Sequence, residues 1–265
     1  MIIKNPKFLV ETDWLATHLN DTNIRVLDCT AFNRQDGSGG IRAESGRDSW
    51  EKEHIPGSGH ADLVNDLSDK DAPFRYMLPP VEQFARSFSG YGVGAGTQAV
   101  LYDSTSGSWA TRIWWMLRAF GFDNACVLNG GLHKWKLEGR PVDTAPSAYP
   151  AAIFLAKPRA GLMANKDEVL AALEQGSTCI LNALSEEQHL GTGGADYGRP
   201  GRIANSVNVP ASDLYEPKTH AYLPPERLAE RFSDVGTDVA ERVITYCGGG
   251  IAASNAAYIL PMLGY

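Results

Sequence analysis

The chain has 265 residues, 43% of them hydrophobic, which is enough to bury the core of one large domain or of two ordinary ones. The net charge is −7 and the charged residues are scattered along the chain without basic blocks. This pattern argues against a nucleic acid or an anionic membrane as partner. No run of about 18 apolar residues occurs and charge and proline precede any apolar run, so we expect a cytosolic protein without a signal peptide.

In chain order, residues 12–28 predict a helix followed by a short strand. Residues 99–122 predict an apolar strand, a loop of small residues and an apolar helix, and residues 122–142 add a strand, a glycine turn and a helix with a tryptophan. The same order then recurs, because 165–182 resembles the first segment and 242–265 resembles the second.

Two further segments match between the halves. HIPGSGHADL (54–63) matches RIANSVNVPASDL (202–214), and YMLPPVEQFARSF (76–88) matches AYLPPERLAERF (221–232). Four matched segments in the same order indicate two copies of one unit. Since short strands alternate with helices, we expect two tandem α/β domains, each a small parallel sheet flanked by helices.

The segment 146–160 is rich in proline and alanine and predicts a linker between an N-terminal domain at 1–145 and a C-terminal domain at 161–265. The second copy has only Tyr265 after Gly264, so we expect it to lack the last strand and helix of the first copy. Either the chain is truncated or another chain completes the sheet. We favour truncation, because an open sheet position leaves backbone groups and apolar surface exposed.

The two copies differ in the loop between the apolar strand and the next helix. The first copy has Asp103 there, whereas the second has Cys247, which marks the first domain as non-catalytic. Backbone N–H groups in a small-residue loop at a helix N-terminus can surround an anion, and this field stabilises a thiolate. We therefore expect Cys247 to be a nucleophile, largely ionised, in an anion cradle formed by Gly248, Gly249, Gly250, Ile251 and Ala252.

Three alternative roles for this loop fit its residues less well. A lone cysteine at a strand end is more often a buried packing residue, and the other three cysteines, which show no metal-binding or disulfide spacing, fit that pattern. A phosphate-binding loop of the Walker type needs Lys and then Ser or Thr where this chain has Ile251 and Ala252. A cysteine phosphatase needs an arginine at the position of Ala253.

These motifs resemble the two-domain rhodaneses, the family of thiosulfate and 3-mercaptopyruvate sulfurtransferases. The likeness covers nearly the whole chain, and VLYDSTSGSWATR, VLNGGLHKW, PGRIANSVNVP and YCGGGIAAS carry it. It implies tandem rhodanese-like domains with the active site in the cleft between them, and a persulfide on Cys247. It further implies a small sulfur donor, an acceptor such as cyanide, a small thiol or a thioredoxin-like protein, and neither metal nor organic cofactor.

The resemblance also bears on the donor. Thiosulfate enzymes of the family usually carry basic residues directly after the cysteine, and this loop has none. CGGGIA is similar to the CGSGVT of mercaptopyruvate enzymes, although Gly249 replaces the serine. The loop therefore leans away from thiosulfate and mildly towards 3-mercaptopyruvate.

Mercaptopyruvate enzymes hold the substrate carboxylate with two arginines, in a stretch that matches residues 181–202. Arg199 and Arg202 are the cations of this stretch, and Arg199 is the first candidate for a bidentate carboxylate contact. Arg202 matches His54 of the first copy, which favours a structural role beside the sheet.

The first domain offers three weaker candidates for substrate binding. The resemblance suggests His54 and Asp48, although a histidine beside a glycine turn is more often structural. The loop 32–40 suggests Arg34 from its position alone.

An alternative function is a non-catalytic rhodanese-like module that binds a protein partner or carries sulfur without turnover. Its supports are the few cations, the missing loop serine and the incomplete second domain. We also expect Pro261 to weaken the last turn of the helix after Cys247, because proline removes a backbone donor.

Overall fold

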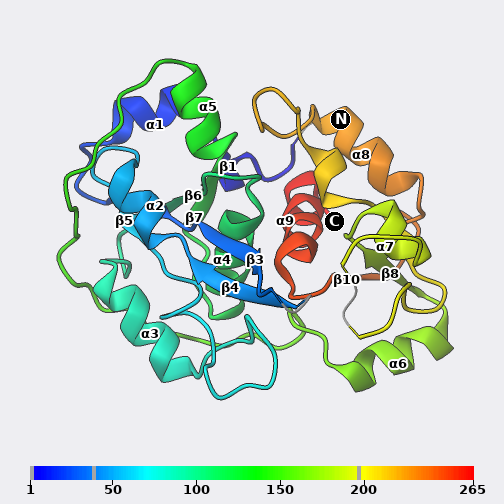
Figure 1. The fold of residues 1–265 in the computed structure, drawn as a ribbon. Coiled ribbons are helices and arrows are strands. Elements are labelled where there is room, and N and C mark those ends of the chain that lie inside the picture. The colour runs from blue at the N-terminus through cyan, green and yellow to red at the C-terminus, as the bar shows by residue number, and fades with distance from the viewer. Residues whose placement is uncertain (1–2, 38–39, 196–197) are drawn as a thin grey trace. The chain divides into compact units, whose positions relative to one another are not determined.

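The structure is a computed structural model that describes residues 3–37, 40–195 and 198–265 (Figure 1). It contains two compact units. The N-terminal unit comprises the described residues of 7–159 together with 217–221, and the C-terminal unit comprises those of 1–6, 160–216 and 222–265. Every helix of the described residues is too short or too polar to traverse a bilayer.

The N-terminal unit is built on a parallel sheet with the strand order β1-β7-β6-β2-β5. Its inner strands are almost continuously buried, as in sheets that are covered on both faces. The strands are β1 (Leu9–Val10), β2 (Ile24–Asp28), β5 (Gly59–His60), β6 (Gln98–Tyr102) and β7 (Ala125–Leu128).

Among the described residues, five α-helices accompany this sheet. Helix α4 packs against β6 and β7. A hydrophobic cluster joins Leu15 of α1 and Trp135 of α5 to buried strand residues such as Val26 and Val100. The helices are α1 (Thr12–His18), α2 (Arg47–Lys52), α3 (Val81–Gly90), α4 (Ser108–Ala119) and α5 (Gly131–Leu137).

Residues 32–35 of the segment 32–40, expected as a loop, belong to strand β3 (Ala31–Gln35), which pairs antiparallel with β4 (Ile41–Ser45). Residues 38 and 39 of that segment lie outside the described residues. Residues 146–159 of the expected linker belong to the N-terminal unit. The Tyr149 hydroxyl accepts a hydrogen bond from the Val26 N–H at 2.9 Å, and Phe154 is 5% exposed.

The C-terminal unit has a parallel sheet with the order β10-β8-β9. The expected α/β fold with parallel sheets is therefore confirmed, and this sheet has three strands among the described residues. Its elements are α6 (Lys166–Gln175), β8 (Thr178–Asn182), α7 (Glu186–Leu190), β9 (Val207–Asn208), the 3₁₀ helix η2 (Ala211–Leu214), α8 (Pro225–Ser233), β10 (Arg242–Tyr246) and α9 (Ile251–Leu263).

Helix α9 continues through Pro261 to Leu263, so the expected weakening does not interrupt the helix. The start of the chain, just before the 3₁₀ helix η1 (Pro6–Phe8), supplies donors to the helix end. The N–H groups of Lys4 and Asn5 donate to the Met262 carbonyl at 3.1 and 3.2 Å, and the Asn5 amide donates to the Pro261 carbonyl at 2.7 Å. These bonds satisfy carbonyl groups that a helix end leaves without a partner.

Candidate functional site

Cys247 lies between the end of β10 and the start of α9 and is half-buried. The Gly250 N–H donates a hydrogen bond to the Cys247 sulfur at 3.1 Å. Gly250 is the N-cap of α9 with φ of +80°, a left-handed conformation that glycine adopts without a steric cost. One backbone donor of the expected cradle is thus in place on the thiol.

Asp103 occupies the matching position after β6 and is 2% exposed. Its Oδ1 accepts hydrogen bonds from the Thr105 N–H and hydroxyl, at 2.8 and 2.9 Å, and from the Gly107 N–H at 3.0 Å. Its Oδ2 accepts from the N–H groups of Trp109 and Ala110, both at 3.1 Å. The first copy therefore shows a complete cradle around two anionic atoms, and a carboxylate fills it.

The two copies place the helix N-terminus alike. Gly107 is the N-cap of α4 with φ of +79°, so it corresponds to Gly250 and donates to the same place in the loop. The second loop is one residue shorter, since three residues separate Cys247 from Ile251 whereas four separate Asp103 from Ser108.

Counting from the N-caps changes which residues match. Counted from the N-caps, the amides of Trp109 and Ala110, which donate to Asp103 Oδ2, correspond in position to those of Ala252 and Ala253. The cradle expected from the sequence ends at Ala252 and omits Ala253. Aligning the helix ends Gly121 and Gly264, rather than Asp103 and Cys247, would have revealed the shortened loop.

Tyr246, the last residue of β10, ties the strand end to its surroundings. Its hydroxyl oxygen accepts hydrogen bonds from the Asn182 side chain and the Ile203 N–H, both at 3.0 Å, and lies 2.8 Å from the Ser206 hydroxyl. The hydroxyl of the matching Tyr102 in the first copy likewise accepts from a backbone N–H, that of Ile55, and lies close to a serine hydroxyl. Cys247 therefore follows a residue whose position is fixed on several sides.

The other cysteines fit the packing role. Cys29 and Cys126 are fully buried, and burial raises the pKa of the Cys126 thiol to about 12. Burial, followed by the charges of Asp28 and Asp103, raises the pKa of Cys29 well above its ordinary value. The pKa of the half-buried Cys179 is also raised by burial.

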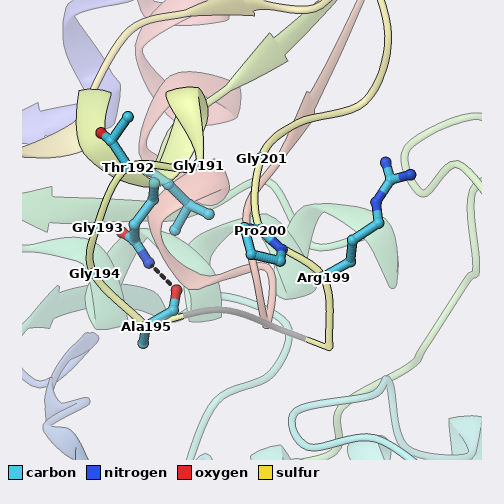
Figure 2. Close-up of a pocket in the computed structure, with 10 residues that line it drawn as sticks. Gly191, Thr192, Gly193, Gly194, Ala195, Arg199, Pro200 and Gly201 are labelled. Atoms are coloured by element: carbon cyan, nitrogen blue, oxygen red, sulfur yellow. Dashed lines mark hydrogen bonds between the residues drawn. The ribbon is translucent and has the colours of Figure 1, made fainter.

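A pocket of about 260 Å³ lies in the C-terminal unit beside the segment between α7 and β9 (Figure 2). The Gln188 side chain donates to the Ala195 carbonyl at 2.7 Å and holds the glycine-rich loop closed on itself. Arg199 is exposed and lines this pocket, although Figure 2 shows its side chain directed away from the glycines. The lining residues are Leu184, Gln188, Gly191, Thr192, Gly193, Gly194, Ala195, Arg199, Pro200 and Gly201.

Arg202 has a structural contact. Its guanidinium donates to the His189 carbonyl at 3.4 Å, near the end of α7. Burial, with the charge of Arg202 second, lowers the pKa of His189. This contact favours the structural role over substrate binding.

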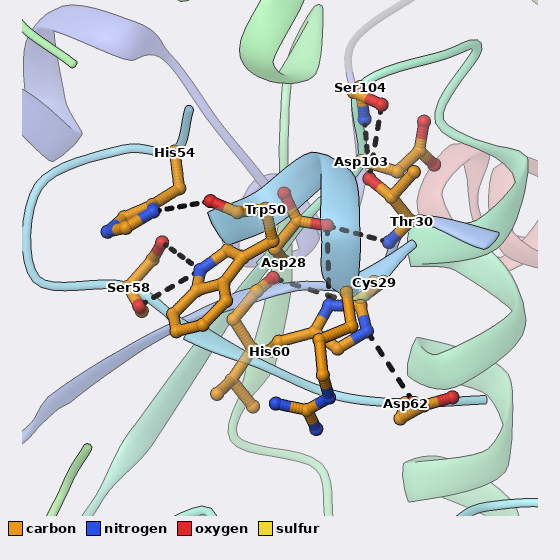
Figure 3. Close-up of polar contacts among 12 residues, drawn as sticks. Asp28, Cys29, Thr30, Trp50, His54, Ser58, His60, Asp62, Asp103 and Ser104 are labelled. Atoms are coloured by element: carbon orange, nitrogen blue, oxygen red, sulfur yellow. Dashed lines mark hydrogen bonds and ion pairs between the residues drawn. The ribbon is translucent and has the colours of Figure 1, made fainter. Parts of the chain in front are cut away.

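The structure does not support His54 as a substrate-binding residue, because its side chain is fully buried. Figure 3 shows its ring beside the Trp50 carbonyl, to which His54 Nδ1 is bonded at 2.7 Å, and the two rings stack at 4.6 Å. Asp48 is exposed in the first turn of α2. The Arg34 guanidinium pairs with Glu44 at 3.1 Å, so its charge is already engaged on the β3–β4 pair.

Comparison with known proteins identifies the fold family. The model of the rhodanese-like domain matches residues 11–138 and 165–265. The chain is 31% identical to the thiosulfate sulfurtransferase of Mus musculus, over 94% of this chain and 84% of that protein. It is also 31% identical to a probable 3-mercaptopyruvate sulfurtransferase of Pseudomonas aeruginosa, over 97% of this chain and 89% of that protein.

A solved structure is similar over nearly its whole length. The crystal structure of SseA from Escherichia coli, described as a 3-mercaptopyruvate sulfotransferase, has a TM-score of 0.84 and 26% identity and covers 97% of this chain and 94% of its own. The repeated α/β units, the cysteine loop and these likenesses agree. The chain belongs to the rhodanese family of sulfurtransferases and carries two rhodanese-like domains.

Proposed function

We propose that this protein transfers a sulfane sulfur from a small donor to a thiophilic acceptor through a persulfide on Cys247. The observation that carries the proposal is the Gly250 N–H on the Cys247 sulfur at 3.1 Å, because it repeats the Gly107 N–H on the Asp103 carboxylate at 3.0 Å. The Asp103 cradle is thus an internal example of how this loop binds an anion.

The proposed reaction has two steps. The Cys247 thiolate attacks the outer sulfur of the donor, a sulfur–sulfur bond forms, and the remainder of the donor leaves with the electron pair of the broken bond. The acceptor thiolate then attacks the outer sulfur of the persulfide, and Cys247 leaves as a thiolate. By analogy with the two oxygens of Asp103, the inner sulfur lies on Gly250 and the outer sulfur on the amides of Ala252 and Ala253.

Donor recognition is proposed for the pocket beside Arg199. A guanidinium can bind the carboxylate of 3-mercaptopyruvate through two hydrogen bonds, and the bare glycine loop adds no charge that would favour a dianion. The relatives are named for both donors, which supports sulfur transfer as the reaction class.

Mass spectrometry of the intact chain tests the proposal. After incubation with 3-mercaptopyruvate or thiosulfate, we expect an adduct of about 32 Da, the mass of one sulfur atom. Cys247→Ser should abolish it, whereas Cys179→Ser, a matched change at the other half-buried cysteine, should retain it.

Two outcomes would contradict the proposal. The absence of an adduct with both donors would favour the non-catalytic alternative. An adduct that survives in Cys247→Ser would place the chemistry on another residue.

A further inference from the structure

A second pocket, here called the acidic pocket, lies in the C-terminal unit, to which all its described lining residues belong. Its volume is about 460 Å³, and helix α7, the end of strand β9 and the 3₁₀ helix η2 border it. It shares no described lining residue with the pocket beside Arg199, because Gln188 of α7 lines that pocket whereas Glu187 and His189 line the acidic pocket. The acidic pocket is therefore separate from the site proposed for the sulfur donor.

The two pockets carry opposite charge. Glu186 and Glu187 of α7 and Asp213 of η2 line the acidic pocket, and its described lining contains neither lysine nor arginine. The pocket beside Arg199 has that cation and no carboxylate among its described lining residues. Both glutamates are exposed, and neither pairs with a cation of the described residues, so their charges are available to a ligand.

His189 adds a buried nitrogen that lacks a partner. It lines the acidic pocket and is 8% exposed, and its Nδ1 has no hydrogen-bond partner among the described residues. Burial, followed by the charge of Arg202, lowers the pKa of His189, although the charge of Glu186 opposes this effect. The ring is therefore neutral at pH 7, and a neutral imidazole has one nitrogen that accepts a hydrogen bond. Because an unpaired buried polar atom costs free energy, a ligand that donates a hydrogen bond to this ring relieves that cost.

Asn208, at the end of β9, presents a further acceptor. Its side-chain N–H groups donate to the carbonyls of Asn182 and Leu184, both at 2.9 Å. Both amide hydrogens are thereby used, and the amide oxygen remains as an acceptor in the pocket lining.

The serine hydroxyls of the lining are engaged within the chain. Ser185 bonds to Gln188, and the Ser212 hydroxyl donates to Asp213 at 3.1 Å. The groups that the acidic pocket offers to a ligand are thus acceptors, namely carboxylates, a neutral imidazole and an amide oxygen, so we expect a cationic ligand that donates several hydrogen bonds.

The arrangement of these acceptors suits an extended cation better than a metal ion. Within the described ranges, no three His, Cys, Asp or Glu side chains converge closely enough to hold a metal ion. A guanidinium carries five N–H donors in a planar fork and can bond to acceptors that face it from several sides. Leu190, which is 52% exposed, and Pro210 also line the pocket and can cover an aliphatic stem.

We propose that the acidic pocket binds a guanidinium group on an aliphatic stem, either as a free small molecule or as the side chain of an arginine in a peptide. The inference does not rest on sulfur transfer, because the residues that carry it lie outside the Cys247 loop and outside the pocket beside Arg199.

Amide chemical shifts of the ¹⁵N-labelled chain test the site directly. Butylguanidine and butylammonium have the same charge and the same stem, and acetyl-Gly-Arg-Gly-amide presents the guanidinium on a peptide. We expect saturable shifts at residues 185–190 and 208–213, with butylguanidine bound at least about threefold more tightly than butylammonium, because it donates more hydrogen bonds. Tighter binding of the peptide than of butylguanidine would identify an arginine side chain as the source, and weaker binding would identify a free small molecule.

Variants of the pocket separate the site from the net charge of the protein. Glu187→Gln and Asp213→Asn should each weaken the binding of butylguanidine about threefold, because each removes one partly exposed charge. His189→Phe keeps a ring of similar size without the nitrogens and should also weaken binding. Glu174→Gln is the matched control, since Glu174 is an exposed glutamate of α6 in the same unit and lines neither pocket.

Cys247→Ser separates this inference from the proposed function. Butylguanidine should bind to Cys247→Ser as to the wild type, so a protein that takes no sulfur from either donor would still be expected to bind the guanidinium.

The absence of saturable shifts with both butylguanidine and the peptide would overturn the inference. Equal losses of affinity in Glu187→Gln and Glu174→Gln would also overturn it, because they would indicate attraction by the net charge alone. Tighter binding of butylammonium or of Mg²⁺ than of butylguanidine at the same residues would overturn the assignment of a guanidinium.

Discussion

Replacing Asp103 with asparagine tests the idea that a built-in carboxylate fills the first cradle. The carboxylate is 2% exposed, with three donors on Oδ1 and two on Oδ2. Whichever way the asparagine amide is oriented, at least two N–H donors face its NH₂ group. A hydrogen bond to a charged group contributes about 1.5–3 kcal/mol, so the free energy of unfolding should fall by roughly 3–6 kcal/mol.

Urea unfolding followed by tryptophan fluorescence measures the free energy of unfolding of the N-terminal unit, which contains Asp103. All six tryptophans lie between residues 14 and 135, within the N-terminal unit. Asp48→Asn is the matched control, because Asp48 is exposed at a helix N-terminus and should cost less than about 1 kcal/mol. A loss of under about 1 kcal/mol in Asp103→Asn, or one no larger than in the control, would refute the cradle reasoning.

Three further changes have defined outcomes. Gly250→Ala places a side chain at φ of +80°, which costs about 1–2 kcal/mol, so we expect the Gly250 N–H to shift away from the Cys247 sulfur. The rate of adduct formation, followed by mass spectrometry, should then fall about tenfold, and an unchanged rate would contradict this prediction. Gly131→Ala brings a Cβ to within 2.4 Å of the Asp103 carbonyl oxygen. The free energy of unfolding measured by tryptophan fluorescence should fall by about 1–3 kcal/mol, whereas an unchanged value would show that the backbone relaxes to relieve the contact. Burial raises the pKa of Asp62, but its hydrogen bonds outweigh this effect and hold the pKa below the ordinary value, so its contribution to stability is present above about pH 4 and is lost as the pH falls through the folded-state pKa. The stability difference between the wild type and Asp62→Asn should therefore narrow in acid, and a difference independent of pH would contradict this assignment.

The repeat, the fold class and the contrast between Asp103 and Cys247 could be predicted from the residues, and the comparisons confirm the family and fold. These features depend on local patterns, since an apolar strand, a small-residue loop and an apolar helix follow one another within about 25 residues of the chain. The role of Cys247 and its loop stays a prediction that the Gly250 contact supports.

Other features depended on packing between distant residues. His54 resembled a site residue in the linear motif, but the fold buries it against Trp50. The composition of residues 146–160 indicated a linker between the domains, but it did not indicate that Phe154 is buried in the N-terminal unit.

By itself, the sequence determined that two copies of one α/β unit are present and that a cysteine replaces a carboxylate in one of them. Only the tertiary structure decided which N–H groups contact Asp103 and Cys247, and that residues 217–221 belong to the N-terminal unit. The physical reason is that strand and helix patterns arise from neighbouring residues. The direction of an N–H group and the partner of a side chain are set by contacts between segments far apart in the chain.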